Sequence, residues 1–141
     1  MNALVLTVSD SVSRGEAEDR SGPAAVEALA ELGITADLGL VEDGVDSVRT
    51  ALLAAVEIGR PLVITTGGTG LAARDLTPEA TSSVIDRPAP GISEAMRAAT
   101  FGVVPMGMLS RGVSGVAGST LIINLPGSVK AVREGLEVVG R

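Results

Sequence analysis

Cysteine, histidine, tryptophan and tyrosine are all absent from this chain of 141 residues, and Phe101 is its one aromatic residue. The lack of cysteine excludes disulfides, thiolate nucleophiles and zinc–sulfur sites. The lack of histidine removes the usual general base, the Ser-His-Asp triad and most transition-metal sites. Any chemistry must therefore come from carboxylates, hydroxyls, Lys, Arg and backbone amides, a set that suits Mg²⁺ and phosphoryl chemistry.

Positive charge is also scarce, because 11 Lys and Arg stand against 17 Asp and Glu, for a net charge of −6. Without a basic stripe or a stacking platform, we expect no nucleic-acid partner. No apolar run approaches membrane-spanning length, and no basic segment precedes an apolar stretch at the amino end. We therefore expect a cytoplasmic protein with no membrane partner. The length predicts a single domain over residues 1–141, and the 45% hydrophobic content predicts a homo-oligomer that buries apolar surface.

Short apolar runs alternate with helical patterns along the chain. Residues 4–8 (LVLTV), 62–66 (LVITT) and 121–124 (LIIN) have the nearly unbroken apolar character of strands in a parallel sheet covered on both faces. Further strands are expected at residues 38–41, 106–109 and 112–117, and helices at residues 23–33, 46–59 (capped by Asp46 or Ser47), 77–85 (capped by Thr77), 92–101 and 128–139 (capped by Ser128). The alternation predicts a three-layer α/β/α domain with a mostly parallel central sheet.

Polar or flexible loops follow four of the predicted strands. In an open parallel sheet the carboxyl ends of the strands form the ligand-binding edge, so we expect these loops to build one site. The loops contain Ser9, Asp10 and Ser11; Asp43; residues 65–75; and Asn124, Leu125, Pro126, Gly127 and Ser128.

The loop after residues 62–66 is the richest of the four. Gly67, Gly68 and Gly70 flank Thr69 and let the backbone approach a ligand and aim several N–H groups at an anion. A tight turn that needs positive φ is the structural alternative. The P-loop ending is absent, and the next helix begins too late for a dinucleotide fingerprint. The loop therefore predicts a site for a small phosphorylated ligand.

Two aspartates and one arginine stand beside this loop in the predicted site. Asp43 and Asp75 follow different strands and could converge on one cation, although each alone could be an ordinary loop or cap acid. Arg74 could be a surface charge, as most arginines are, and the same holds for Arg111.

The start of the last predicted helix is a second place for an anion. Ser128 as N-cap creates a helix N-terminus, which favours negative charge. Lys130 in the first turn opposes the helix dipole, which makes sense if it faces a phosphate, and a solvated surface lysine is the alternative.

Together these loops resemble the Mog/MoaB family of molybdenum cofactor biosynthesis, whose molybdopterin-binding fold is also found in the gephyrin G domain. The resemblance covers nearly the whole chain in order, and TTGGTG with RDLTPEAT is its most specific part. The matching stretches are TVSDSVSRGEAEDRSGP (7–23), LVEDGVDSV (40–48), ITTGGTGLAARDLTPEAT (64–81), PGISEAMR (90–97), LSRGVSG (109–115) and LIINLPGSVKAVREGL (121–136).

The resemblance implies binding of molybdopterin and, in the Mog branch, transfer of AMP from ATP with Mg²⁺ onto its terminal phosphate. The family's paired aspartates fall on Asp43 and Asp75, which implies catalytic and Mg²⁺-binding roles for both. The ligand-contacting segments fall on Ser9, Asp10 and Ser11, on Gly67, Gly68 and Gly70, and on the turn from Asn124 to Ser128. Val129 stands where proline is common, a loss of backbone pre-organisation.

Two other functions remain open. One is a non-catalytic protein that binds molybdopterin or a precursor, as a MoaB-like relative, and the other is a different Mg²⁺-dependent nucleotide-processing enzyme on the same fold. Retention of both Asp43 and Asp75 favours catalysis, because a pure binder has little reason to keep paired acids beside anionic phosphates. The resemblance further implies a homotrimer, with the hexamer of the MoaB branch as the alternative. It also suggests the molybdate-inserting enzyme of the same pathway as a partner.

Overall fold

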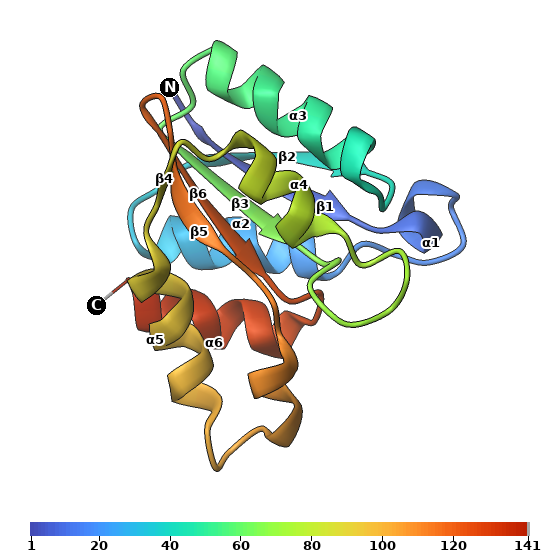
Figure 1. Ribbon diagram of the computed structural model, residues 1–141, viewed down its shortest axis with the longest axis vertical. Helices are drawn as coiled ribbons and strands as arrows, with labels where there is room; N and C mark the ends of the chain where they lie inside the picture. The colour runs from blue at the N-terminus through green and yellow to red at the C-terminus, as the bar shows by residue number, and fades with distance from the viewer. Residues whose placement is uncertain (141) are drawn as a thin grey trace.

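Six strands form one mixed sheet at the centre of the computed structural model, which describes residues 1–140, with the backbone alone for Pro105 and Met106 (Figure 1). The order across the sheet is β2-β1-β3-β6-β5-β4, in which β2, β1, β3 and β6 are parallel while β5 and β4 are antiparallel to their neighbours. The carboxyl ends of the four parallel strands therefore meet at one edge. The strands are β1 (Ala3–Val8), β2 (Ala36–Val41), β3 (Leu62–Thr66), β4 (Arg87–Pro88), β5 (Ser114–Ala117) and β6 (Thr120–Leu125).

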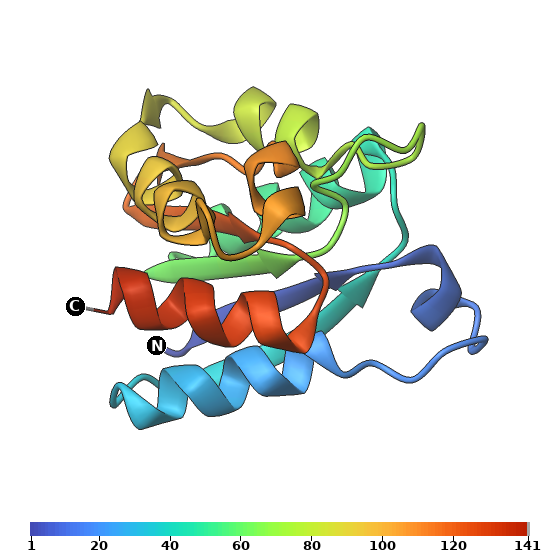
Figure 2. The same ribbon diagram turned by 90° about the horizontal axis from the view of Figure 1, so that it is seen from below.

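Helices cover both faces of the sheet, as Figure 2 shows. One face carries α2 and α6 side by side, and the other carries α3 and α4. Helix α5 packs against α6, β5 and the short 3-10 helix η1. None of the helices within residues 1–140 is long and apolar enough to cross a membrane. The helices are α1 (Asp10–Ser13), α2 (Ser21–Glu31), α3 (Val45–Glu57), α4 (Thr77–Val84), α5 (Pro90–Thr100), η1 (Pro105–Leu109) and α6 (Val129–Val139).

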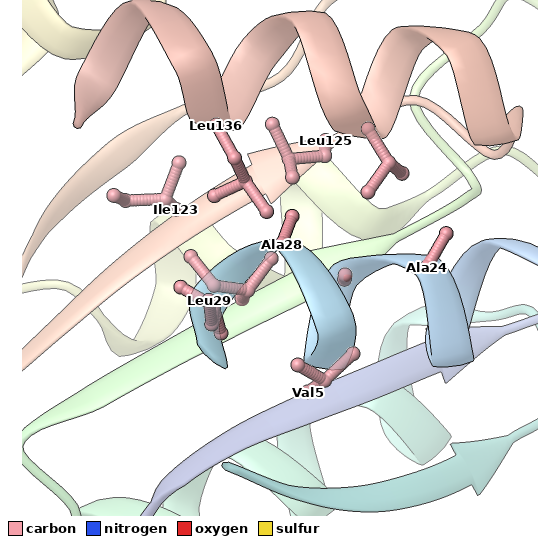
Figure 3. Packing of buried hydrophobic residues seen from close by; sticks show 10 residues of the cluster. Val5, Ala24, Ala28, Leu29, Ile123, Leu125 and Leu136 are labelled. Carbon is pink, nitrogen blue, oxygen red and sulfur yellow. The ribbon is translucent and has the colours of Figure 1, made fainter. Parts of the chain in front are cut away.

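Two apolar cores lie on either side of the sheet, because successive strand residues point to opposite faces. Val5 belongs to the core under α2 and α6, and its neighbour Leu6 belongs to the core under α3 and α4. Figure 3 shows the first core, where Ala24 and Ala28 of α2 point toward α6 and the side chains of Leu125 and Leu136, and their small size lets the two helices lie close together. Burial on both faces explains why the central strands are continuous apolar runs.

The predicted three-layer α/β/α fold is confirmed, and so is the cap at Ser128, whose Oγ accepts from Ala131 N at 3.1 Å. The strand predicted at residues 106–109 is wrong, since η1 occupies this segment. Pro105 explains the difference, because it has no N–H for a strand ladder and favours the first turn of a helix.

Two predicted helix caps are also wrong. Helix α3 begins at Val45 behind Gly44, whose φ of +129° lets the chain turn directly into the helix, and Ser47 Oγ donates to Glu42 O at 2.8 Å. Thr77 is the first residue of α4 and not its cap. Helix α1 and strand β4 were too short to be predicted, with 4 and 2 residues.

Candidate functional site

The glycine loop after β3 and the turn after β6 lie against each other at the carboxyl edge of the sheet. Gly67 N donates to Leu125 O at 3.0 Å, and a Cβ on Gly127 would lie 3.3 Å from Gly67 Cα. Gly67 has a φ of +97°, and a Cβ there would collide with the carbonyl oxygen of Val8. Positive φ, the structural alternative for these glycines, therefore applies at Gly67, which also lies too close to the Val8 backbone for a side chain.

A cavity of ≈ 710 Å³ opens between this edge and the segment from α5 to η1. This volume lies within the range of small-molecule sites in proteins. Its lining combines the glycine loop with apolar side chains such as Met96, Val104 and Leu109. The predicted site residues that line it are Gly67, Gly68, Thr69, Gly70, Asp75, Asn124, Pro126, Gly127, Ser128 and Lys130.

Consecutive backbone amides of the glycine loop lack hydrogen-bond acceptors. Within residues 1–140, the N–H groups of Gly68, Thr69 and Gly70 donate to no backbone or side-chain atom. Backbone N–H groups are strong donors that are nearly always paired when withdrawn from water, and successive free ones form an anion-binding concavity. These three N–H groups are therefore available to an anionic ligand.

Asp10 and Arg74, two further predicted site residues, lie beside the cavity and are not part of its lining. Arg74 donates to both carboxylate oxygens of Asp10, with Nε to Oδ2 at 2.6 Å and Nη2 to Oδ1 at 3.0 Å. Arg74 Nη2 also donates to the backbone oxygen of Asp43 at 2.7 Å. Ser9 caps α1 by accepting from Val12 N at 3.3 Å, and its hydroxyl lies 3.2 Å from that of Ser11. These residues join the loops after β1, β2 and β3.

The carboxyl groups of Asp10 and Asp43 have pKa values shifted in opposite directions. The hydrogen bond from Arg74 lowers the pKa of Asp10. Burial raises the pKa of Asp43, and the negative charges of Asp10 and Asp75 add to this shift against the hydrogen bond from the Asp10 amide. A cation beside Asp43 would relieve that unfavourable environment.

The oxygen donors around the glycine loop fit Mg²⁺. Asp43 Oδ1 lies 3.2 Å from the position of a Cβ on Gly68, and Asp75 Oδ2 lies 2.8 Å from that of a Cβ on Gly70. The buried Thr77 Oγ1 has no hydrogen-bond partner among the described residues, and a Cβ on Gly68 would collide with it. No group of three or more His, Cys, Asp or Glu within residues 1–140 is placed to hold a metal ion. One or two carboxylates are the usual protein share of a Mg²⁺ site, where water and phosphates supply the other ligands.

Asn124 contributes to the site through its position in the core. Its Oδ1 accepts from Val113 N at 3.1 Å, and its Nδ2 donates to Thr65 Oγ1 at 2.9 Å and Thr81 Oγ1 at 3.0 Å. The side chain is 1% exposed. These bonds fix the end of β6 and hence the start of the turn at Pro126, so the amide group itself is already engaged.

Lys130 lies at the rim of the cavity and stays exposed. Its Nζ lies 3.9 Å from Glu134 Oε1, one turn further along α6. Such a solvated pair contributes little to stability and leaves the ammonium group able to reach an anion.

Two arginines of the site could not be identified from their sequence positions. Arg111 Nε donates to Gly70 O at 2.9 Å, and Arg97 Nη1 donates to Gly112 O at 2.8 Å. Arg97 lines the cavity, while Arg111 holds the glycine loop from outside it. Both residues lie within the stretches of family resemblance, which were the one signal that pointed to them.

A mostly parallel sheet with free loop amides and a cavity at its carboxyl edge defines an α/β protein built to bind an anionic small molecule. The chain belongs to the molybdenum cofactor biosynthesis family, because the probable molybdopterin binding domain matches residues 4–141. The resemblance seen in the sequence is thereby confirmed.

Known relatives extend over nearly the whole chain. The molybdopterin adenylyltransferase of Helicobacter pylori strain J99 is 43% identical over 139 residues, which cover 96% of this chain and 79% of that protein. The gephyrin of Dictyostelium discoideum is 38% identical over 96% of this chain, which spans only 20% of gephyrin's length.

Solved structures confirm the fold. A molybdopterin biosynthesis protein from Mycobacterium abscessus is 42% identical and superposes with a TM-score of 0.94, over 99% of this chain and 89% of that one. The molybdopterin biosynthesis enzyme MoaB from Thermus thermophilus is 48% identical with a TM-score of 0.89, over 98% of this chain and 88% of that one. The molybdopterin biosynthesis Mog protein from Mycobacterium ulcerans, 44% identical, shares the architecture with a TM-score of 0.91 over 98% of this chain and 91% of that one.

Proposed function

We propose that this protein is an enzyme that transfers AMP from ATP to the terminal phosphate of molybdopterin in the presence of Mg²⁺ and releases pyrophosphate. The observation that carries the proposal is the set of free amides at Gly68, Thr69 and Gly70, with Asp43 and Asp75 on either side of them. The similarity to a molybdopterin adenylyltransferase supports it. Paired acids beside an anion site favour catalysis over binding alone, because carboxylates repel phosphates unless a cation lies between them.

The residues present suit a reaction that needs alignment and charge neutralisation more than a base. The attacking phosphate oxygen of molybdopterin is ionised at neutral pH, so no histidine is required. It forms a bond to the α-phosphorus of ATP, and the bond from that phosphorus to the bridging oxygen of pyrophosphate breaks. The amides of the glycine loop and the start of α6 orient the phosphates. Mg²⁺, when held by Asp43 and Asp75, supplies positive charge to the phosphates.

Incubation with molybdopterin, ATP and Mg²⁺, with detection of pyrophosphate, tests this function. We expect release that requires all three components and stops when EDTA removes the metal. Tight binding of molybdopterin without pyrophosphate release would favour the non-catalytic alternative. Release without molybdopterin would favour a different nucleotide-processing enzyme.

We also propose that the protein is a homotrimer that acts in the cytoplasm. Large apolar side chains that remain exposed support an oligomer, among them Phe101 at 77% and Val103 at 72%, and Leu38 and Leu40 on the edge strand β2. An adenylylated product also calls for a consuming enzyme, for which the molybdate-inserting enzyme is our candidate partner. Light scattering tests the assembly by measuring its mass. The mass of a hexamer would favour that assembly over the trimer, and a stable 14.1 kDa monomer would contradict both.

A further inference from the structure

Arg111 binds the glycine loop through both its backbone and its side chain. Its backbone N–H donates to Thr69 O at 2.9 Å, and its Nε donates to Gly70 O at 2.9 Å. Its Nη2 donates to the backbone oxygen of Asp75. One residue from the segment between η1 and β5 therefore holds both the peptide group that carries the free Gly70 amide and the backbone that carries Asp75.

The same guanidinium joins this loop to helix α4. Arg111 Nη1 donates to both carboxylate oxygens of Glu79, at 3.1 and 2.7 Å, in the first turn of that helix. The bond lowers the pKa of Glu79, so the pair is fully charged at neutral pH. All three guanidinium nitrogens are thus engaged at once, in a planar geometry that the ammonium group of lysine cannot reproduce.

Other contacts hold the parts of the loop on either side of Gly70, since Thr77 N donates to Gly68 O at 3.1 Å and Thr69 is buried. Arg74 binds Asp10 on the far side, and Asp75 Oδ2 accepts from Ala72 N at 3.0 Å inside the loop. Leu71 at its tip is 68% exposed and contributes no core packing. Arg111 is thus the side chain that ties the backbone of Gly70 and Asp75 to Glu79 in the first turn of α4, and it does not itself line the cavity.

We propose that Arg111 is a positioning residue for the transfer reaction. By binding the carbonyl groups of Thr69, Gly70 and Asp75, it fixes the Gly70 amide and the backbone that carries the Asp75 carboxylate in reactive geometry. This inference rests on the proposed adenylyl transfer. Arg111 acts through the loop and Glu79 and touches no reacting atom. A small displacement of catalytic groups by a mutation outside the reacting centre can reduce turnover by about a hundredfold.

The test compares Arg111→Lys and Glu79→Gln with the matched control Arg60→Lys. Arg60 also combines a carboxylate partner, Asp37, with backbone oxygens, among them Asn2 O at 3.0 Å, but it lies at the opposite end of the strands. For each variant we would measure melting temperature, kcat and KM for molybdopterin, and amide exchange in the loop at Ala72, Asp75 and Thr77, whose N–H groups are hydrogen-bonded. The double variant of Arg111 and Glu79 shows whether the two residues act as one unit.

We expect Arg111→Lys to reduce kcat by about a hundredfold with little change in KM, and to speed amide exchange in the loop. Glu79→Gln should act in the same direction, the double variant should lose no more than Arg111→Lys alone, and Arg60→Lys should leave kcat and loop exchange unchanged. Equal losses of melting temperature and turnover in Arg111→Lys and Arg60→Lys would overturn the inference, since they indicate a structural role alone. Wild-type loop exchange in Arg111→Lys would overturn it as well. Absence of pyrophosphate release by the wild-type protein would instead overturn the proposed function, so the two failures are distinguishable.

Discussion

Asp10 and Asp43 each accept a hydrogen bond from the backbone amide of the other, with Asp10 N to Asp43 Oδ2 at 3.0 Å and Asp43 N to Asp10 Oδ1 at 3.1 Å. The pair joins the loops after β1 and β2 and brings two carboxylates together, against their mutual repulsion. Arg74 compensates part of this charge through its bonds to Asp10. The arrangement leaves Asp43 Oδ1 without a hydrogen bond from within residues 1–140, and this oxygen faces the Gly68 side of the loop.

Neutralising Asp43 or Asp75 should reduce turnover by at least about a hundredfold and leave pterin binding nearly intact. The reason is that charge held through a metal matters most in the transition state. Asp43→Asn and Asp75→Asn keep an oxygen acceptor for the amides that the carboxylates now bind, so both variants should fold. Pyrophosphate release measures turnover, and titration with molybdopterin measures binding. Asp46→Asn is the control, because Asp46 is exposed. Wild-type rates in both variants would show that these aspartates are not catalytic.

The raised pKa of Asp43 predicts a pH dependence with two opposite consequences. Burial, with the charges of Asp10 and Asp75, makes this carboxyl take up a proton at a higher pH than the ordinary value of 3.8. Binding of Mg²⁺ to the free protein should therefore weaken on acidification before a normal aspartate would titrate, because protons compete with the metal for Asp43. For stability the sign is reversed, since a raised folded-state pKa favours the fold at low pH and loses that contribution as the pH rises through it.

The opposite effects of Asp43 on activity and on stability can be tested with Asp43→Asn at neutral pH. This variant should lose activity and keep or gain melting temperature, because it no longer holds an ionised carboxylate in an unfavourable place. Asp10 gives the contrast: its lowered pKa stabilises the fold above the ordinary value, and this contribution is lost as the pH falls through the lowered one. Thermal melts across the acid range measure both. A less stable Asp43→Asn at neutral pH would contradict the assigned cause.

Gly127→Val should weaken binding of Mg-ATP. A Cβ at this position would already lie 3.3 Å from Gly67 Cα, and the added methyl groups would push apart two glycines that line the cavity. Gly91→Val is the matched control, since a Cβ on Gly91 meets no heavy atom of the described chain within 4 Å. Calorimetric titration with Mg-ATP measures the affinity of both variants, and only Gly127→Val should bind more weakly than the wild-type protein. Unchanged affinity in Gly127→Val would place the nucleotide elsewhere at the sheet edge.

Asn124→Leu should destabilise the protein by at least about 2 kcal/mol, because it leaves several buried polar groups without partners. The groups affected are the amide of Val113 and the hydroxyls of Thr65 and Thr81. Chemical denaturation measures the loss, with Asn2→Leu as control because Asn2 is exposed. A loss no larger in Asn124→Leu than in Asn2→Leu would show that this network is unimportant for stability.

The central strands and the glycine loop could be predicted because their causes are local. A strand buried on both faces must be apolar throughout, as β1, β3 and the start of β6 are, and loops after parallel strands must meet at one edge. The free amides of Gly68, Thr69 and Gly70 then follow from glycines whose backbones adopt conformations that other residues avoid.

Other parts of the site depend on contacts between distant segments. Nothing near Arg111 in the sequence shows that it binds Glu79, because that pairing exists only once β5 and β6 bring the segment next to α4. The sequence predicts Asn124 as part of the site, but its hydrogen bonds to Thr65 and Thr81 could not be predicted, because both partners lie far away along the chain. The apolar wall of the cavity comes from α5 and η1, and η1 had been predicted as a strand.

The place of β6 in the sheet has a consequence for synthesis of the protein. Its two neighbours are β3, which precedes it by a long stretch of chain, and β5. During translation, β1, β2 and β3 leave the ribosome first, and the apolar run Leu62–Thr66 keeps one unpaired edge until Thr120–Leu125 emerges. Because α6 covers the same core and follows β6, the nascent chain also keeps half of one sheet face open. We therefore expect the nascent chain to be most prone to aggregation, and to engage chaperones, after β3 has emerged and before β6 emerges.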